Sequence, residues 1–169
     1  MRRGLLWLCL AAGCLLLANH DLAAQDHPNL DWLIYDDATR DDYAITIGAE
    51  ASERNLAVPN DRAPQKRVLL LIPSPSVEAY SLAVNTILRG FKDANLPTRF
   101  DIWYYNKDEA LALEALQWAY AQPVDLIMSV GSSATSFLME HHTGHSIPAV
   151  TSASKDPVAS GHLTDAARG

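Results

Sequence analysis

Small polar residues follow three apolar segments of this sequence, at positions where they could bind a small ligand. They are Ser74 and Ser76 after residues 68–72, Ser132 and Ser133 after residues 124–130, and Ser154 with Asp156 after residues 147–150. Each group stands just before a stretch that reads as a helix, whose first backbone N–H groups have no partner within the helix. Hydroxyls beside such donors suit a carboxylate or sugar hydroxyls, so the three junctions together predict a polar pocket.

The same residues also suit a purely structural role. Serine and aspartate are common N-caps, and glycine allows a tight turn between a strand and a helix. In the junction Gly131-Ser132-Ser133, one of the two serines is expected to cap the helix that follows. The two roles are compatible, because a helix capped by one serine can still offer its remaining donors to a ligand.

Two further clusters invite a functional interpretation and favour a structural one. The run His141-His142-Thr143-Gly144-His145 falls where a helix should end, with Gly144 placed for a left-handed turn. No cysteine or matching carboxylate cluster accompanies these histidines, so no metal site is predicted. In Trp103-Tyr104-Tyr105, strand alternation makes at least one ring part of the core, and packing is favoured over ligand stacking.

Motifs of catalysis and of nucleotide binding are not legible in the sequence. There is no G-x-S-x-G nucleophile elbow, no Ser/His/Asp order, no close acid pair and no glycine-rich phosphate loop. We therefore predict a protein that is not an enzyme and has no cofactor. An enzyme would have to use Asp156 or a histidine as its acid or base.

The elements that must position these residues alternate between strand and helix. Apolar or β-branched runs predict strands at 68–72, 99–105, 124–130 and 147–150, and spacings of three and four predict helices at 77–95, 108–120 and 134–141. This alternation predicts an α/β fold with a doubly wound parallel sheet. In such sheets the carboxyl ends of the strands share one edge, so the three polar junctions should converge there.

Composition and charge limit the classes of function. The chain has 169 residues, 49% hydrophobic content and a formal net charge of -7, which suits one domain or one lobe of a larger protein. The sequence has no lysine or arginine cluster beyond Lys66-Arg67, which argues against a nucleic-acid partner, since phosphates need such residues to neutralise them.

The first 24 residues have the anatomy of a secretory signal peptide. Arg2 and Arg3 precede an apolar run from residue 4 to residue 18, and cleavage is predicted after Ala24. The run is shorter than the roughly 20 residues that span a bilayer. Lipid attachment at Cys14 is the less favoured alternative. We therefore expect an exported, periplasmic protein whose mature chain contains no cysteine.

Residues 25–65 differ in composition from the rest of the chain. They are rich in aspartate and turn-forming residues, with two short apolar pieces at 32–35 and 43–47. Such pieces bury little surface, so the stretch is predicted to be an acidic, poorly packed extension, a solvated linker with one or two transient strands. A dedicated partner-binding arm is the alternative. Residues 66–169 are predicted to form the α/β lobe.

Several motifs of this lobe resemble a known family. They are a strand followed by Ser74-Pro75, a helix carrying Arg89-Gly90-Phe91, and the segments PVDLIMSVGSSAT and IPAVTSASKDPVASG. Across residues 67–169 the chain resembles the periplasmic substrate-binding proteins of ABC transporters, of the uncharacterised or tryptophan/tyrosine type. The family commonly has proline where Ser133 stands.

The resemblance implies the first lobe of a periplasmic-binding-protein clamshell that closes on a small solute such as an amino acid. It further implies delivery to an ABC permease in the inner membrane, with a cleft lined by Ser74, Ser76, Tyr80, Ser132, Ser133, Ser154 and Asp156. A carboxylate would bind at Ser132 and Ser133, and an ammonium group at Asp156. A clamshell needs about 250 to 300 residues, so the sequence is interpreted as a fragment holding one lobe.

Two other functions remain open at this point. An exported ligand-sensing domain would use the same lobe to signal to a membrane partner, and an exported α/β enzyme would need a mechanism that the motifs do not supply. An apolar face left uncovered by a missing second lobe is expected to favour dimerisation or aggregation.

Overall fold

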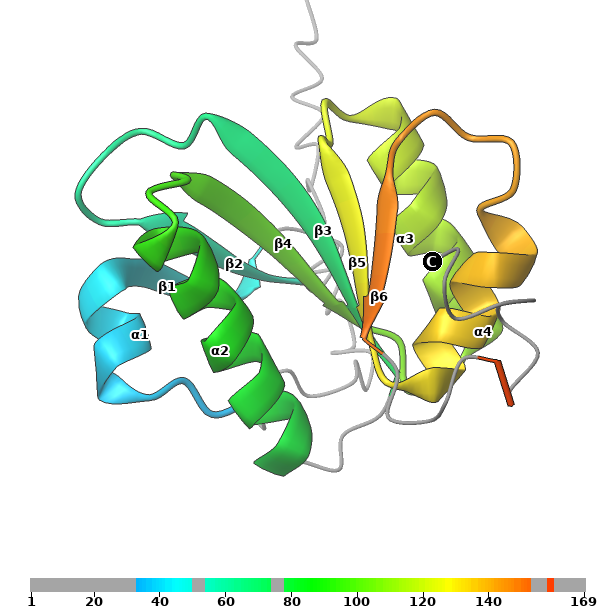
Figure 1. Cartoon of the computed structure of the whole chain (residues 1–169), viewed down its shortest axis with the longest axis horizontal. Helices are drawn as coiled ribbons and strands as arrows, with labels where there is room; N and C mark the ends of the chain where they lie inside the picture. Colours follow the sequence, from blue (N-terminus) through cyan, green and yellow to red (C-terminus); the bar gives the residue numbers. More distant parts are fainter. Residues whose placement is uncertain (1–32, 50–53, 74–77, 153–157, 160–169) are drawn as a thin grey trace, which may run out of the picture.

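A computed structural model describes residues 33–49, 54–73, 78–152 and 158–159 of the chain. Six strands form one mixed sheet, and helices lie on both of its sides (Figure 1). In chain order the elements are α1 (Asp37–Asp42), β1 (Tyr43–Ala49), β2 (Arg54–Pro59), β3 (Lys66–Ile72), α2 (Glu78–Asp93), β4 (Thr98–Tyr104), α3 (Glu109–Ala121), β5 (Leu126–Val130), α4 (Ser132–His141) and β6 (Ala149–Ser152).

The strands lie in the order β1-β2-β4-β3-β5-β6. Strands β4, β3, β5 and β6 are parallel, whereas β1 and β2 are antiparallel to their neighbours. Strand β3 lies inside the sheet because residues 68–72 are all apolar and all at most 1% exposed, so both faces of the strand are covered. The predicted α/β class is confirmed, but the prediction of a sheet that is parallel throughout is wrong at the β1-β2 edge.

Two apolar cores cover the two faces of the sheet. Helix α2 packs Val84 and Leu88 against Leu70 and Phe100 on one face. On the other face, α3 and α4 pack small and apolar side chains against the alternate residues of β3, β4 and β5. The helices predicted at 77–95, 108–120 and 134–141 are therefore confirmed to within a few residues, because their apolar spacing matches one buried face each.

The stretch that the sequence predicts to be a poorly packed extension is part of the fold. Residues 33–49 and 54–59 supply α1, β1 and β2, and Leu33, Tyr35 and Tyr43 are each at most 3% exposed. Long-range hydrogen bonds hold them: Asn85 Nδ2 donates to the carbonyl of Ile34 at 2.9 Å, and the Tyr43 hydroxyl donates to the carbonyl of Leu88 at 2.9 Å. The prediction of a solvated linker is wrong for these residues, because its few apolar side chains reach a core built by distant segments.

A buried ionic cluster, which we call the Asp101 cluster, joins β2, β3 and β4. The Asp101 carboxylate is fully buried and accepts hydrogen bonds from the Nε atoms of Arg54 and Arg67 at 2.8 Å each and from Arg99 Nη2 at 3.0 Å. The guanidinium groups of Arg54 and Arg67 lie 4.3 and 4.7 Å from the ring centre of Trp118 on α3. Burial by itself raises the pKa of Asp101, but hydrogen bonds from Arg67 and Arg99 outweigh it and hold the pKa below its usual value.

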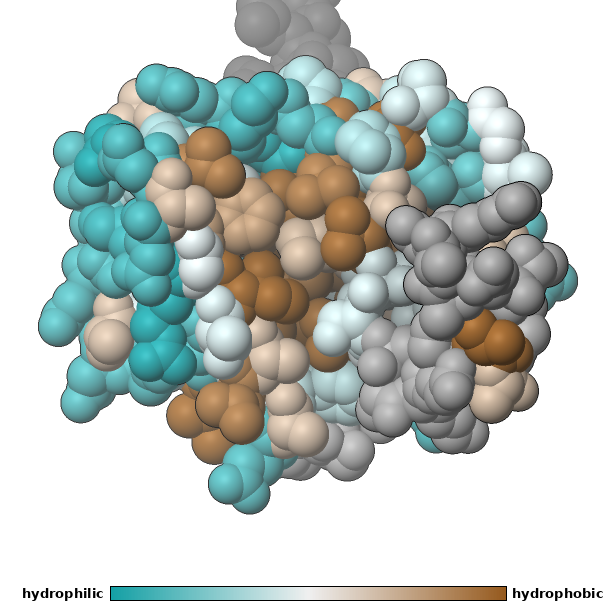
Figure 2. All heavy atoms as spheres, in the orientation of Figure 1, coloured by the Kyte–Doolittle hydropathy of each residue, from teal (hydrophilic) through white to brown (hydrophobic). Residues whose placement is uncertain are grey.

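Part of the sheet face beside α2 carries apolar side chains that the described residues do not bury fully. The register places Met128 of β5 beside Val150 of β6, and Val150 is 49% exposed. Ile87 and Phe91 of α2 and Leu126 of β5 are half-buried against the same core. Figure 2 shows apolar residues gathered over this part of the molecule. That a second lobe covers such a face stays a prediction.

Among the described residues, no helix combines the length and the apolar character that crossing a membrane requires. The predicted signal peptide, residues 1–24, lies outside the described residues.

Candidate functional site

The candidate site lies where the carboxyl ends of β3 and β5 meet. The chain leaves β3 for β4 on one side of it and then returns to β5 on its other side. Helix α2, after β3, packs on one face of the sheet, whereas α3 and α4 pack on the other. Connections that leave neighbouring strands toward opposite faces open a crevice between them, which is where α/β sheets commonly bind ligands.

Tyr80 lies across this crevice from the first turn of α2. A Cβ atom placed on Gly131 would be only 2.8 Å from the Tyr80 hydroxyl oxygen and 3.1 Å from its ring carbon Cε1. Gly131 has φ 92° and ψ 155°, a conformation that is essentially restricted to glycine. The glycine is therefore needed twice, for its backbone conformation and for the close approach of the tyrosine ring.

Helix α4 begins at the crevice without the cap that the sequence predicts. Its N-cap is Gly131, and no side chain makes a capping hydrogen bond, so the expectation that Ser132 or Ser133 is the cap is wrong. Ser132 is half-buried and Ser133 is exposed, and both are the first residues of the helix itself. The reason is the turn: Gly131 already has the non-helical conformation of a cap, which moves both serines into the first turn.

The end of β6 lies beside the same turn. The backbone N–H of Gly131 donates to the carbonyl of Ser152, the last residue of β6, at 2.7 Å. The carboxyl ends of β5 and β6 therefore meet at one edge of the sheet, as the parallel pairing of these strands requires.

A fourth junction at this edge was missed by the sequence reasoning. Between β4 and α3, Asn106 and Lys107 both have positive φ, 48° and 59°, and the Tyr104 hydroxyl donates to Asn106 Oδ1 at 2.7 Å. Tyr105, at the start of this turn, is buried, and burial together with the nearby Tyr80 phenol raises its pKa to about 12. No sequence signal indicates this turn, because neither asparagine nor lysine requires a positive φ. The two consecutive left-handed residues are visible only in the structure.

Of the seven residues predicted to bind a ligand, the structure describes Tyr80, Ser132 and Ser133, and it places the Tyr80 ring against Gly131, directly before the two serines. The other four, Ser74, Ser76, Ser154 and Asp156, lie outside the described residues and stay predictions. Chemically, the described part of the crevice offers neutral hydroxyl groups and the start of a helix. Such groups bind by donating and accepting hydrogen bonds.

The histidine cluster lies at the carboxyl end of α4 and has a structural role there. The helix ends at His141, and the imidazole of His142 lies between the Tyr120 hydroxyl, 2.9 Å from Nδ1, and the carbonyl of Ile147, 2.7 Å from Nε2. The ring of His145 stacks on Tyr120 with 3.6 Å between ring centres. Within the described part of the chain, no group of three or more potential metal-binding side chains is present. The structural interpretation of these histidines explains their geometry.

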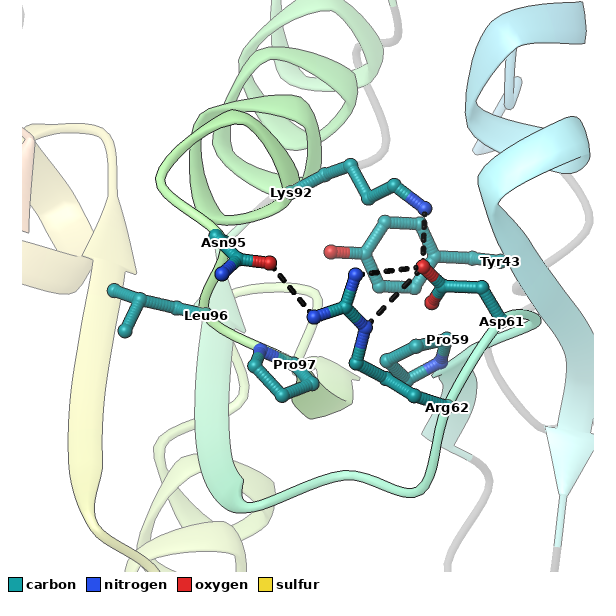
Figure 3. A pocket seen from close by; sticks show the side chains of 8 residues that line it. All are labelled: Tyr43, Pro59, Asp61, Arg62, Lys92, Asn95, Leu96 and Pro97. Carbon is teal, nitrogen blue, oxygen red and sulfur yellow. Dashed lines mark hydrogen bonds and ion pairs between the residues drawn. The ribbon is translucent and has the colours of Figure 1, made fainter.

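Figure 3 shows a second indentation, between the loop after β2 and the end of α2. It has a volume of about 10 Å³, which is roughly the space of one water molecule. The Asp61 carboxylate accepts hydrogen bonds there from Lys92 at 3.1 Å and from Arg62 at 3.0 Å, and Arg62 also donates to Asn95 at 2.7 Å. These contacts fill the pocket and attach the loop to α2, so its role is structural.

No family model, curated protein or solved structure matches this chain. The geometry of the site is therefore the basis on which a function can be argued.

Proposed function

We propose that this protein is the extracytoplasmic solute-binding component of an ABC importer, and that the described domain is one lobe of its clamshell. In this proposal the crevice at the carboxyl ends of β3 and β5 forms one wall of the cleft. The solute is a small polar molecule of the amino-acid class, and an inner-membrane permease receives it. The lobe binds and releases its solute without chemical change.

One observation carries the proposal: the Tyr80 ring lies against Gly131 where the strand order reverses. A flat aromatic face next to the start of a helix offers two complementary contacts. The helix start favours a carboxylate, through its backbone donors and its partial positive charge. The ring offers an apolar surface to the side chain of an amino acid. The exposed Ser133 hydroxyl adds a donor beside them.

The apolar face next to α2, which is partly exposed among the described residues, also supports a lobe that packs against more protein. Val150 and Met128 lie side by side in β6 and β5, and β6 forms one edge of the sheet. An apolar sheet face is normally buried against another layer. A second lobe or hinge segment would provide such a layer.

The test is an NMR titration of the full chain with L-tryptophan, L-tyrosine and L-leucine, following backbone amide shifts. We expect saturable shifts at Gly131, Ser132 and Ser133 for at least one amino acid. The affinity should lie near the millimolar range, about 4 kcal/mol of binding free energy, because a single wall leaves the ligand open to water. Absence of any saturable shift at these amides with all three amino acids would contradict the proposal.

Two serine variants separate binding from folding. In Ser133→Ala the affinity should fall while the melting temperature stays unchanged, because the exposed hydroxyl makes no capping bond. Ser146→Ala is the matched control: this serine is also exposed but precedes β6, at the opposite end of the strand. Equal affinities for the two variants would place the ligand elsewhere.

A further inference from the structure

A larger cavity lies at the opposite edge of the sheet, where β3, β4 and β5 begin. Its volume is about 460 Å³, within the range of roughly 300 to 1,000 Å³ typical of small-molecule sites. The residues that line it are Pro64, Gln65, Lys66, Arg67, Arg99, Pro123, Val124 and Asp125. It is therefore separate from the crevice, which lies at the carboxyl ends of the same strands.

The lining of this cavity is positively charged in an acidic protein. Lys66, Arg67 and Arg99 contribute three cationic groups and Asp125 one carboxylate, whereas the whole chain has a formal net charge of -7. Asp101 lies behind the arginines. Its carboxylate is fully buried and is paired with Arg67 and Arg99, so it does not contact solvent. A concave surface lined mainly by one sign of charge raises the local concentration of ions of the opposite sign.

Two of these cations retain hydrogen-bond donors for a ligand. Arg67 uses three of its five N–H groups on described partners, two on Asp101 and one on Gln122, which leaves two. Lys66 uses one of three, donating from Nζ to Asp125 Oδ1 at 2.9 Å, which leaves two. Both side chains reach solvent, with 18% of Arg67 and 57% of Lys66 exposed.

The arginine is also fixed in position before any ligand arrives. Its guanidinium binds the buried Asp101 carboxylate with Nε at 2.8 Å and lies 4.7 Å from the centre of the Trp118 ring. Its backbone N–H donates to Asp125 Oδ2 at 2.9 Å, which joins the starts of β3 and β5. A group held by its surroundings loses little conformational freedom on binding, so more of its interaction energy appears as affinity.

We propose that this cavity is a second binding site, for a small molecule that carries an oxyanion, either a carboxylate or a phosphate. The anion binds between the remaining donors of Lys66 and Arg67. Guanidinium and ammonium groups form short, charge-assisted hydrogen bonds with both kinds of oxyanion. The rest of the molecule lies against Pro64, Pro123 and Val124, which form the uncharged part of the lining.

The experiment is an NMR titration of the full chain with inorganic phosphate and, separately, with acetate, with sodium chloride adjusted to keep the ionic strength constant. Saturable shifts at the amides of Lys66, Arg67 and Asp125 support the site. A response to phosphate identifies a phosphate ligand, and a response to acetate alone identifies a carboxylate. Linear or absent shifts with both anions would overturn the proposal.

Two lysine variants test whether the cavity itself is responsible. Lys66→Gln should lower the affinity for the anion by up to about fivefold, because it removes one exposed positive charge from the site. Lys92→Gln is the matched control: it removes the same charge, but from the ion pairs with Asp61 and Asp42 away from the cavity. An equal loss of affinity in both variants would show a general effect of net charge and would refute the site.

Discussion

Replacing Asp101 by asparagine should destabilise this protein more than any surface charge change. The carboxylate is fully buried and accepts hydrogen bonds from Arg54, Arg67 and Arg99. Asparagine keeps the size of the side chain, but it removes the negative charge and directs an NH₂ donor toward groups that are themselves donors. Breaking a buried ion pair from one side costs about 3 to 5 kcal/mol, because the remaining charges lose their counter-ion.

The lower end of that range is expected here. Arg67 and Arg99 are 18% and 26% exposed, so both can regain contact with water after the substitution, whereas Arg54 is only 2% exposed and cannot. A loss of about 3 kcal/mol corresponds to a decrease in melting temperature of about 6 to 12 °C for a domain of this size. It is also a substantial part of a typical folding free energy, about 5 to 15 kcal/mol.

The loss should depend on pH in a defined direction. The pKa of Asp101 is lowered in the folded protein, so its charge stabilises the fold at any pH above the value of the unfolded chain, about 3.9. That contribution is lost as the pH falls below this value and through the lower folded pKa. The difference in unfolding free energy between wild type and Asp101→Asn should therefore be complete at pH 7 and shrink below about pH 4.

Urea unfolding followed by tryptophan fluorescence measures this directly, since the Arg54 and Arg67 guanidinium groups lie over Trp118. Asp61→Asn serves as the control, because Asp61 also binds an arginine and a lysine but is 39% exposed. Its loss should be much smaller. If the two variants unfold at the same urea concentration, the Asp101 cluster does not behave as a buried ionic network and our reasoning fails.

Two further predictions concern the backbone conformation of Gly131 and the hydrogen bonds of Asn85. Gly131→Ala should lower the free energy of unfolding by about 2 to 4 kcal/mol, because it adds both backbone strain and a clash with Tyr80. Gly144 also has positive φ but open space around it, so Gly144→Ala should add only the backbone strain. The urea midpoints of the two variants separate these contributions. Asn85→Ala should cost about 1 to 3 kcal/mol and accelerate amide hydrogen exchange at Asp36, whose N–H donates to Asn85 Oδ1 at 3.2 Å; unchanged exchange there would show that residues 33–36 are held by other contacts.

The sequence was sufficient for the elements whose signals are local. Residues 68–72 are apolar without interruption, which predicts a strand covered on both faces, and β3 lies inside the sheet as expected. Helix α2 places its apolar residues at spacings of three and four, and these residues face the core. The α/β class follows from the alternation of such segments. The polar junctions were also visible, because serine and glycine at the end of an apolar run mark the start of a helix.

Elements whose stability comes from distant residues were not predictable in this way. Strand β2 begins with Arg54 and Asn55, which read as solvent-exposed polar residues but are 2% and 0% exposed. Their burial depends on Asp101, which accepts from Arg54, and on Tyr35, whose hydroxyl accepts from Asn55 Nδ2 at 3.0 Å. The local residue pattern does not indicate these long-range hydrogen bonds. The sequence therefore predicted a linker for residues 25–65.

The candidate site divides along the same line. The sequence by itself determined that hydroxyl-bearing residues follow the apolar segments of β3, β5 and β6, because strand ends and helix starts are set by neighbouring residues. Only the tertiary structure showed that Tyr80 packs against Gly131 and that this glycine, rather than a serine, is the N-cap of α4. It also showed that Lys66 and Arg67 line one cavity at the opposite edge of the sheet. The physical reason is that strand order and helix packing, which bring distant residues into contact, are properties of the whole sheet.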